Sequence, residues 1–181
     1  RHLPHCDITA VEINPHVIGF RQAFCIPEDN ERFRIHCDDA TRFIAHHTER
    51  TDIILLDAFD GTGIAPELTA PDFYSAVFDT LSPNGILVMN LAGDKAGYDE
   101  PRQQLAGIFD DRILSIKVRD GGNQIILAFK NPAFAPRWDS IQNQAKLLEQ
   151  KLGLEFTRFA RHLEKSSVTR HLSPRRTPRR R

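Results

Sequence analysis

Two aspartates, Asp57 and Asp60, follow directly on the apolar run Ile53-Ile54-Leu55-Leu56. A buried parallel strand has a run of this kind, and open α/β sheets bind ligands beyond the carboxyl ends of their strands. We therefore expect both carboxylates to face a ligand crevice. Paired carboxylates in such a place can hold a cationic substrate and accept a proton from it.

Strands and helices alternate along the chain around these acids. Asn14 before Pro15 is typical of a helix start, as is Asp38 or Asp39 before the next apolar stretch. The pattern predicts strands and helices in turn at residues 8–13, 14–24, 33–37, 38–47, 52–57, 71–81 and 86–91. This alternation predicts a doubly wound, mostly parallel sheet.

The end of the sheet has a different pattern. Residues 113–119 and 124–129 are both typical of strands, and the turn residues Asp120-Gly121-Gly122-Asn123 join them. We expect an antiparallel hairpin here, followed by an amphipathic helix at residues 137–152, for which residues 156–163 are a candidate extension. A mostly parallel sheet that ends in such a hairpin resembles the class I adenosylmethionine-dependent methyltransferase-like fold, which is Rossmann-like.

Composition limits the class of protein. The chain has 181 residues, 40% of them apolar, which is enough for one hydrophobic core. No apolar stretch reaches about 18 residues, so no membrane span is expected, and the chain does not open with a signal-peptide pattern. Cys6, Cys25 and Cys37 include no Cys-x-x-Cys pair, which argues against a disulfide framework or a zinc knuckle. These features predict a soluble, cytoplasmic protein.

Charge is distributed unevenly along the chain. Residues 161–181 carry eight Lys or Arg and one acid, so the preceding residues have 16 basic and 23 acidic side chains, a net charge of −7. We expect one folded domain at residues 1–165 and a disordered basic tail at residues 166–181. A solvated tail without a partner is favoured over contact with nucleic acid or acidic lipid.

Five blocks of the chain carry a family resemblance. They are Val11-Glu12-Ile13-Asn14-Pro15, Cys37-Asp38-Asp39-Ala40-Thr41-Arg42-Phe43, Leu56-Asp57-Ala58-Phe59-Asp60-Gly61, Glu67-Leu68-Thr69-Ala70-Pro71-Asp72-Phe73-Tyr74 and Leu81-Ser82-Pro83-Asn84-Gly85-Ile86-Leu87-Val88. In order and spacing they resemble the spermidine synthase family of polyamine aminopropyltransferases over roughly residues 7–130. The resemblance implies that residues 1–165 form a catalytic domain of this family.

The resemblance also implies a nucleoside cosubstrate, decarboxylated S-adenosylmethionine or S-adenosylmethionine, bound by Glu12, Asp38 and Asp39. Glu12 matches the acid that binds the ribose hydroxyls, and a carboxylate can accept hydrogen bonds from two neighbouring hydroxyls. Asp39 matches the acid that accepts from the adenine amino group, and a helix cap explains an acid there equally well. No metal is implied, and His46-His47 is interpreted as a solvated helix end.

By the same resemblance, Asp57 matches the acid proposed to take a proton from the attacking amine, and Asp60 the acid that grips the amine. An aliphatic amine with a pKa of about 10 is almost wholly protonated at neutral pH, whereas only its neutral form can attack. Substrate contacts are implied for Tyr74 and Asn90 as well, and for Tyr74 a place in the core is the alternative. Since the family usually has glutamine where this chain has Asn90, the identity of the amine stays open.

The front of the family's fold is the main departure. The resemblance implies a first strand with a glycine-rich turn, and the residues before Ile8 supply neither. The chain is therefore expected to be a fragment, or a family member without its front part, and its catalytic activity on its own stays open. In the parent topology the first strand lies between residues 8–13 and 52–57. Its absence predicts a gap at the centre of the sheet or a new strand pairing.

The favoured function is transfer of an aminopropyl group from decarboxylated S-adenosylmethionine to a small-molecule diamine such as putrescine. A methyltransferase on the same fold is one alternative, and a non-catalytic remnant that serves as an interaction module is another. The acids Asp57 and Asp60 argue against the methyltransferase, because many methyltransferases have an Asn-Pro-Pro-aromatic motif or an unpaired residue there. The oligomeric state stays open, with a homodimer among the possibilities.

Overall fold

The computed structural model describes residues 5–57, 65–91, 98–118 and 122–171. This part of the chain is an α/β protein, and the expected fold class is confirmed. Its elements are β1 (Ile8–Glu12), α1 (Pro15–Gly19), β2 (Phe33–Cys37), α2 (Ala40–His46), β3 (Thr51–Leu56), the short 3₁₀ helix η1 (Pro66–Thr69), α3 (Pro71–Thr80), β4 (Leu81–Leu91), α4 (Asp99–Ile108), β5 (Ile113–Lys117), β6 (Gln124–Phe129), α5 (Trp138–Leu152) and α6 (Phe156–His171).

Two helices differ from the expectation. Helix α1 ends at Gly19 instead of near residue 24, because the chain continues in tight turns, and Cys25 has a left-handed backbone with φ 54° that a helix cannot accommodate. Helix α4 was not expected. Its sequence begins with Asp99, Glu100 and Pro101, residues suited to a first helical turn but also common in loops.

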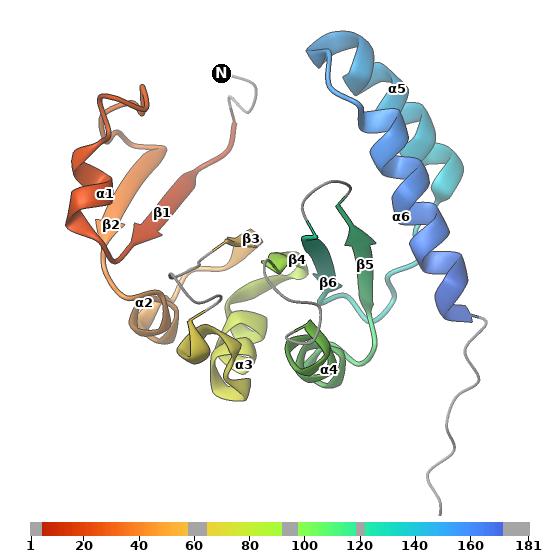
Figure 1. Ribbon diagram of the computed structural model, residues 1–181, viewed down its shortest axis with the longest axis horizontal. Coiled ribbons are helices and arrows are strands. Elements are labelled where there is room, and N and C mark those ends of the chain that lie inside the picture. Colours follow the sequence, from red (N-terminus) through yellow and green to blue (C-terminus); the bar gives the residue numbers. More distant parts are fainter. Residues whose placement is uncertain (1–4, 58–64, 92–97, 119–121, 172–181) are drawn as a thin grey trace, which may run out of the picture.

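The strands form two sheets in place of the single sheet expected from the sequence (Figure 1). β1 and β2 pair in parallel, and Glu12 lies opposite Cys37 at their carboxyl ends. The second sheet has the order β3-β4-β6-β5, in which only β3 and β4 are parallel. β1 and β3 are not hydrogen-bonded neighbours, which agrees with the gap expected between them. The predicted antiparallel hairpin of β5 and β6 is confirmed.

The hydrophobic core belongs to the second sheet. Alternate residues of β4, namely Leu87, Met89 and Leu91, are fully buried, as the two-residue period of a strand requires. Helices α3 and α4 pack against each other and against this sheet, on the same side of it (Figure 1). By contrast, no residue of β1, α1 or β2 is buried. Helix α2 contacts β1 as well as η1 and α3, so it connects the two parts.

The start of β4 departs from regular pairing. Leu81 lies opposite Thr51 and Ile86 opposite Ile53, so β4 has an irregular segment between these two pairs, over the residues expected to form a turn. Gly85 ends this segment, and a Cβ atom there would lie 2.8 Å from Leu81 Cβ. Residues 82–85, which have the composition of a turn, thus form an irregular segment inside strand β4. The strand pairs before and after this segment hold it in place.

The end of the chain forms a helical hairpin beside β5 (Figure 1). Helix α5 ends at Leu152, and the next residue, Gly153, has a φ of 69°, the left-handed conformation that terminates helices. Helix α6 continues to His171, and the domain boundary expected at residue 165 stays a prediction. The hydroxyl of Ser166 bonds to the backbone of Ser115 in β5, and this contact keeps the helix on the sheet beyond that point. The remainder of the expected basic tail, residues 172–181, lies outside the described residues. No helix in the described ranges is long and apolar enough to cross a membrane.

Ser166→Ala is expected to lower the free energy of unfolding by about 1–2 kcal/mol. The Ser166 hydroxyl donates to Ser115 O at 2.5 Å and accepts from Ser115 N at 3.2 Å, so alanine leaves both groups of this edge strand without that partner. Urea unfolding measures the change. Ser75→Ala is the control, because the Ser75 hydroxyl is exposed and bonds only within its own helix, to Pro71 O. Equal effects of the two substitutions would contradict the docking of α6.

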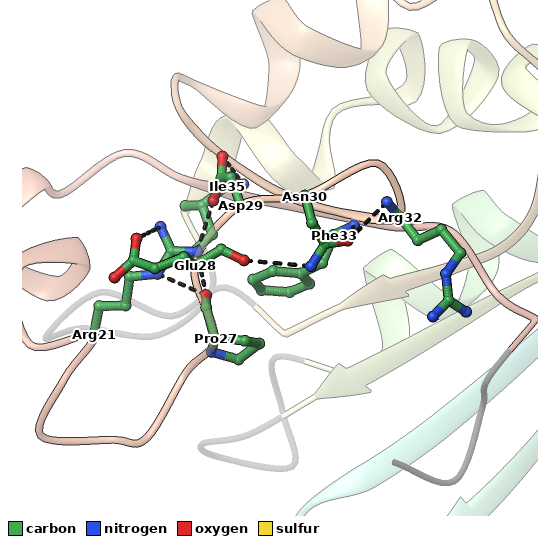
Figure 2. Close-up of polar contacts among 8 residues, drawn as sticks. All are labelled: Arg21, Pro27, Glu28, Asp29, Asn30, Arg32, Phe33 and Ile35. Atoms are coloured by element: carbon green, nitrogen blue, oxygen red, sulfur yellow. Dashed lines mark hydrogen bonds and ion pairs between the residues drawn. The ribbon is translucent and has the colours of Figure 1, made fainter.

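Polar contacts hold the loop between α1 and β2, as Figure 2 shows. Arg21 Nε donates to Pro27 O at 2.8 Å, and Arg21 Nη2 donates to Asp29 Oδ1 at 2.7 Å. The guanidinium also lies over the Phe33 ring, 5.8 Å from its centroid. Asn30 Oδ1 accepts from the Phe33 backbone N–H at 3.1 Å. These contacts order a part of the chain that has no buried side chains of its own.

Arg21→Met is expected to destabilise the protein at neutral pH, and by less in acid. The Arg21 guanidinium holds the pKa of Asp29 below its ordinary value of 3.8. A lowered folded-state pKa stabilises the protein above the unfolded pKa, and this stabilisation is lost as the pH falls through the folded pKa. Urea unfolding at neutral pH and below pH 3.8 measures the difference from wild type, which should shrink in acid.

The matched control is Arg158→Met, which removes an exposed ion pair with Glu155. Exposed pairs between residues three apart on a helix contribute little, so this variant should unfold almost like wild type. The contradicting result is a free energy of unfolding of Arg21→Met that differs from that of wild type by the same amount at neutral and at acid pH. This result would exclude the ion pair with Asp29 as the cause of the difference.

Candidate active site

Asp57 and Asn90 come together at the carboxyl ends of β3 and β4. These strands are parallel with Leu56 opposite Met89, so the next residue of each strand lies beside its neighbour. Asn90 Nδ2 donates to Asp57 Oδ1 at 2.9 Å. The other oxygen, Asp57 Oδ2, receives no hydrogen bond from a described residue. The position of Asp57 beyond a parallel strand agrees with the sequence-based expectation.

A third side chain, which the sequence indicated only as a turn residue, joins this pair. Asn123 Nδ2 donates to Asn90 Oδ1 at 3.1 Å, so the amide of Asn90 links Asn123 to Asp57. The contact exists because β6 runs antiparallel to β4, with Asn90 opposite Ile125. The hairpin signal predicted that a turn is present, but no local pattern indicates which strand its residues will meet.

Glu12 and Asp38 lie next to each other at the carboxyl ends of β1 and β2. The backbone N–H of Asp38 donates to Glu12 O at 3.2 Å, and Glu12 Oε1 accepts from Asn14 N at 2.8 Å. Asp38 Oδ1 accepts from Arg42 Nε at 2.6 Å, and this bond to Arg42 is the main reason why the pKa of Asp38 lies below its ordinary value. Glu12 Oε2 receives no hydrogen bond within the described ranges, whereas the Asp38 charge already has a partner.

Asp39 caps helix α2. Its Oδ1 accepts from the backbone N–H groups of Thr41 and Arg42 at 2.9 and 3.0 Å, and the Thr41 hydroxyl also donates to it. The hydrogen bond from the Thr41 hydroxyl is the main reason why the pKa of Asp39 lies below 3.8, and the backbone N–H groups lower this pKa further. Asp39 is therefore ionised at neutral pH. The capping interpretation is confirmed. The contact of Asp39 with adenine stays a prediction. In such a contact, Asp39 Oδ2 would accept the hydrogen bond, because Oδ1 already accepts from the helix.

Tyr74 lies in the core of the second sheet. Its side chain is fully buried, its hydroxyl donates to Met89 Sδ at 3.6 Å, and burial raises its pKa. This position supports the core alternative that the helical spacing indicated. A direct contact of Tyr74 with a substrate stays a prediction, which would require the residues around it to move.

The structure does not bring all the expected site residues together. Asp60 belongs to residues 58–64, which lie outside the described residues. No hydrogen bond or ion pair between described residues joins the acids of β1 and β2 to the Asp57 pair. The side chains of Asp38, Arg42, Phe43, His46 and His47 line an open pocket beside α2. Within the described ranges, no three His, Cys, Asp or Glu side chains lie close enough to hold a metal ion.

Comparison with solved structures defines the class of fold. The chain is similar to human methyltransferase-like protein 13 in complex with SAH, with a TM-score of 0.67 and 21% identity over 98% of this chain and 77% of that one. It is also similar to spermidine synthase from Thermotoga maritima, with a TM-score of 0.64 and 17% identity over 93% of this chain and 57% of that one. The chain therefore has the adenosylmethionine-dependent methyltransferase-like fold, which at these identities is all that the structural similarity shows.

Sequence comparison identifies the family. The spermine/spermidine synthase domain matches residues 1–96, and the chain belongs to this family. The polyamine aminopropyltransferases of Chromobacterium violaceum and of Neisseria meningitidis serogroup A are each 33% identical to it over 168 residues, which are 92% of this chain and 64% of each relative. The chain thus spans slightly less than two thirds of the length of these curated relatives. The resemblance carried by the five sequence blocks is confirmed.

Proposed function

We propose that the chain supplies the catalytic base of a polyamine aminopropyltransferase, which transfers an aminopropyl group from decarboxylated S-adenosylmethionine to a diamine such as putrescine. The observation that carries the proposal is the pair of Asp57 and Asn90 at the end of β3 and β4, in a chain of the spermine/spermidine synthase domain family. One oxygen of Asp57 is bound by Asn90, and the other receives no hydrogen bond from a described residue.

Asp57 is the proton acceptor in this proposal. The amine is almost wholly protonated in solution, with a pKa of about 10, and an ammonium nitrogen has no lone pair, so it must lose a proton before it attacks. The C–N bond to the aminopropyl group then forms as the C–S bond of the sulfonium breaks, and methylthioadenosine leaves. The Asn90 amide holds Oδ1, which leaves Oδ2 to take that proton. Asp60, in the segment that follows β3, attracts the positive charge of the diamine.

The cosubstrate supplies an aminopropyl carbon beside a sulfonium, which makes that carbon an electrophile. The acids of β1 and β2 suit its nucleoside part. Glu12 Oε2 can accept from ribose hydroxyls and Asp39 Oδ2 from the adenine amino group, because each carboxylate has its first oxygen occupied by backbone N–H groups. Asp38 contributes through Arg42, whose side chain it orients beside this site.

A reducing compartment suits this function. The cysteines Cys6, Cys25 and Cys37 are all free, which is usual in the cytoplasm and unusual in secreted proteins. We propose that the reaction takes place in the cytoplasm.

Product analysis tests the proposed function. The chain is incubated with putrescine and, in separate reactions, with decarboxylated S-adenosylmethionine or with S-adenosylmethionine. Methylthioadenosine and spermidine in the first reaction are the expected products. Adenosylhomocysteine in the second reaction would favour a methyltransferase, and neither product together with no nucleoside binding would favour an interaction module.

A further inference from the structure

We propose that Asn123 is a positioning residue, which orients the amide of Asn90 and thereby determines which oxygen of Asp57 is open to the substrate. The kinetic consequence rests on the proposed function. The orientation itself is a property of the folded chain and can be measured without turnover.

The argument begins with what each group can donate or accept. A primary amide has one acceptor oxygen and one donor NH₂ group, and an ionised carboxylate only accepts. Asn90 Oδ1 accepts from Asn123 Nδ2 at 3.1 Å, and Asn90 Nδ2 donates to Asp57 Oδ1 at 2.9 Å. Turning the Asn90 amide over would place its oxygen against the carboxylate and its NH₂ group against the NH₂ group of Asn123. Both neighbours therefore favour the same orientation.

Asn123 matters most after proton transfer. A protonated carboxyl can donate as well as accept, so Asp57 by itself would no longer oppose the reversed orientation of Asn90. The bond from Asn123 Nδ2 to Asn90 Oδ1 opposes that reversal, because the two amides would have to turn over together.

Backbone contacts hold Asn123 on both sides. Its carbonyl accepts from Val118 N at 2.8 Å, which closes the hairpin before β6. The preceding residue, Gly122, has a φ of 72°, and its carbonyl accepts from the hydroxyl of Tyr98 at 2.9 Å. Tyr98 is itself 7% exposed, so it belongs to the core. The backbone of Asn123 is therefore held by hydrogen bonds on both sides. A residue that orients another side chain needs such support.

Two substitutions and one control separate positioning from general damage. Asn123→Leu removes the donor at similar size, and Asn123→Asp replaces the donor by an acceptor. Asn131→Leu is the control, because Asn131 Nδ2 donates to Asn84 Oδ1 at 2.7 Å and so forms the same kind of amide pair at the other end of the paired strands β4 and β6.

Nuclear magnetic resonance of the Asn90 side chain measures the orientation directly. In ¹H–¹⁵N spectra, its NH₂ signals are identified by their loss in Asn90→Ala. Both Asn123 variants should shift these signals and speed their exchange with water about tenfold, whereas Asn131→Leu should leave them unchanged. Asn90 signals that are the same in wild type and in both Asn123 variants would overturn the proposal.

Kinetics measure the consequence for the reaction. With decarboxylated S-adenosylmethionine and putrescine, Asn123→Asp should lower kcat about tenfold and leave KM for putrescine within about twofold, because orientation affects proton transfer more than binding. Unchanged kcat in both Asn123 variants of an active protein would overturn the positioning role. If wild type forms no methylthioadenosine, the aminopropyltransferase proposal fails, and the Asn90 signals still decide the role of Asn123.

Discussion

Asp57→Asn is expected to slow aminopropyl transfer by about 10²- to 10⁴-fold, the usual contribution of a positioned general base. Asparagine has nearly the same shape as aspartate but cannot take a proton from the ammonium group of the substrate. Asp57 is exposed, so the substitution should leave the fold intact. The measurement is the rate of methylthioadenosine formation at saturating putrescine, with circular dichroism to verify folding.

The control for this prediction is the same substitution at the other end of the strand. Asp52 lies near the start of β3, and its Oδ1 accepts from the Ser82 hydroxyl at 2.7 Å. Asp52→Asn should therefore keep the rate within about twofold of wild type, since it removes a charge from the same strand without touching the proposed proton acceptor. Equal losses in both variants would show that the charge of the strand, and not the base at its end, controls the rate.

Leu87→Ala is expected to lower the free energy of unfolding by about 2–5 kcal/mol. Leu87 is fully buried in β4, with Ile54 of β3 and Ala128 of β6 as its pairing partners. Alanine removes apolar surface from the core and leaves a cavity that the strands on both sides prevent from closing. Urea unfolding followed by circular dichroism measures the change.

Leu55→Ala is the matched control on the neighbouring strand. Leu55 pairs with Val88 but is 74% exposed, because its side chain projects from the face of β3 opposite that of the buried Leu56. The loss should be less than about 0.5 kcal/mol. A loss as large as that of Leu87→Ala would indicate that another surface covers β3 in solution, which would contradict the exposure of this strand.

Local patterns predicted the parts of the fold that have local causes. Asp39 was expected as a helix cap because its carboxylate bonds to N–H groups two and three residues ahead, a contact that needs no distant partner. The bounds of β2 and β6 follow from apolar runs between turn residues. The position of Asp57 follows from the same reasoning, since the end of a strand is a local property.

Local sequence patterns did not predict contacts between distant segments of the chain. Ile53 and Leu55 look like residues of a buried strand, yet they are 58% and 74% exposed, because burial depends on whether a neighbouring strand and helix lie over them. Helix α6 extends past residue 165 because Ser166 meets β5, about fifty positions earlier in the chain. The reversal of β6 against β4 likewise decides that a turn residue, Asn123, reaches Asn90.

The sequence by itself determined the family, the order of strands and helices apart from α4, and the carboxylates Glu12, Asp39 and Asp57 at the carboxyl ends of strands, because each of these depends on residue types over a short span. Only the tertiary structure decided which of these groups meet. It separated the strands into two sheets, placed Tyr74 in the core, and connected Asp57 to Asn90 and Asn123. The physical reason is that hydrogen bonds and burial act between groups that are close in space, and the pairing of strands and the packing of helices on them determine which groups those are.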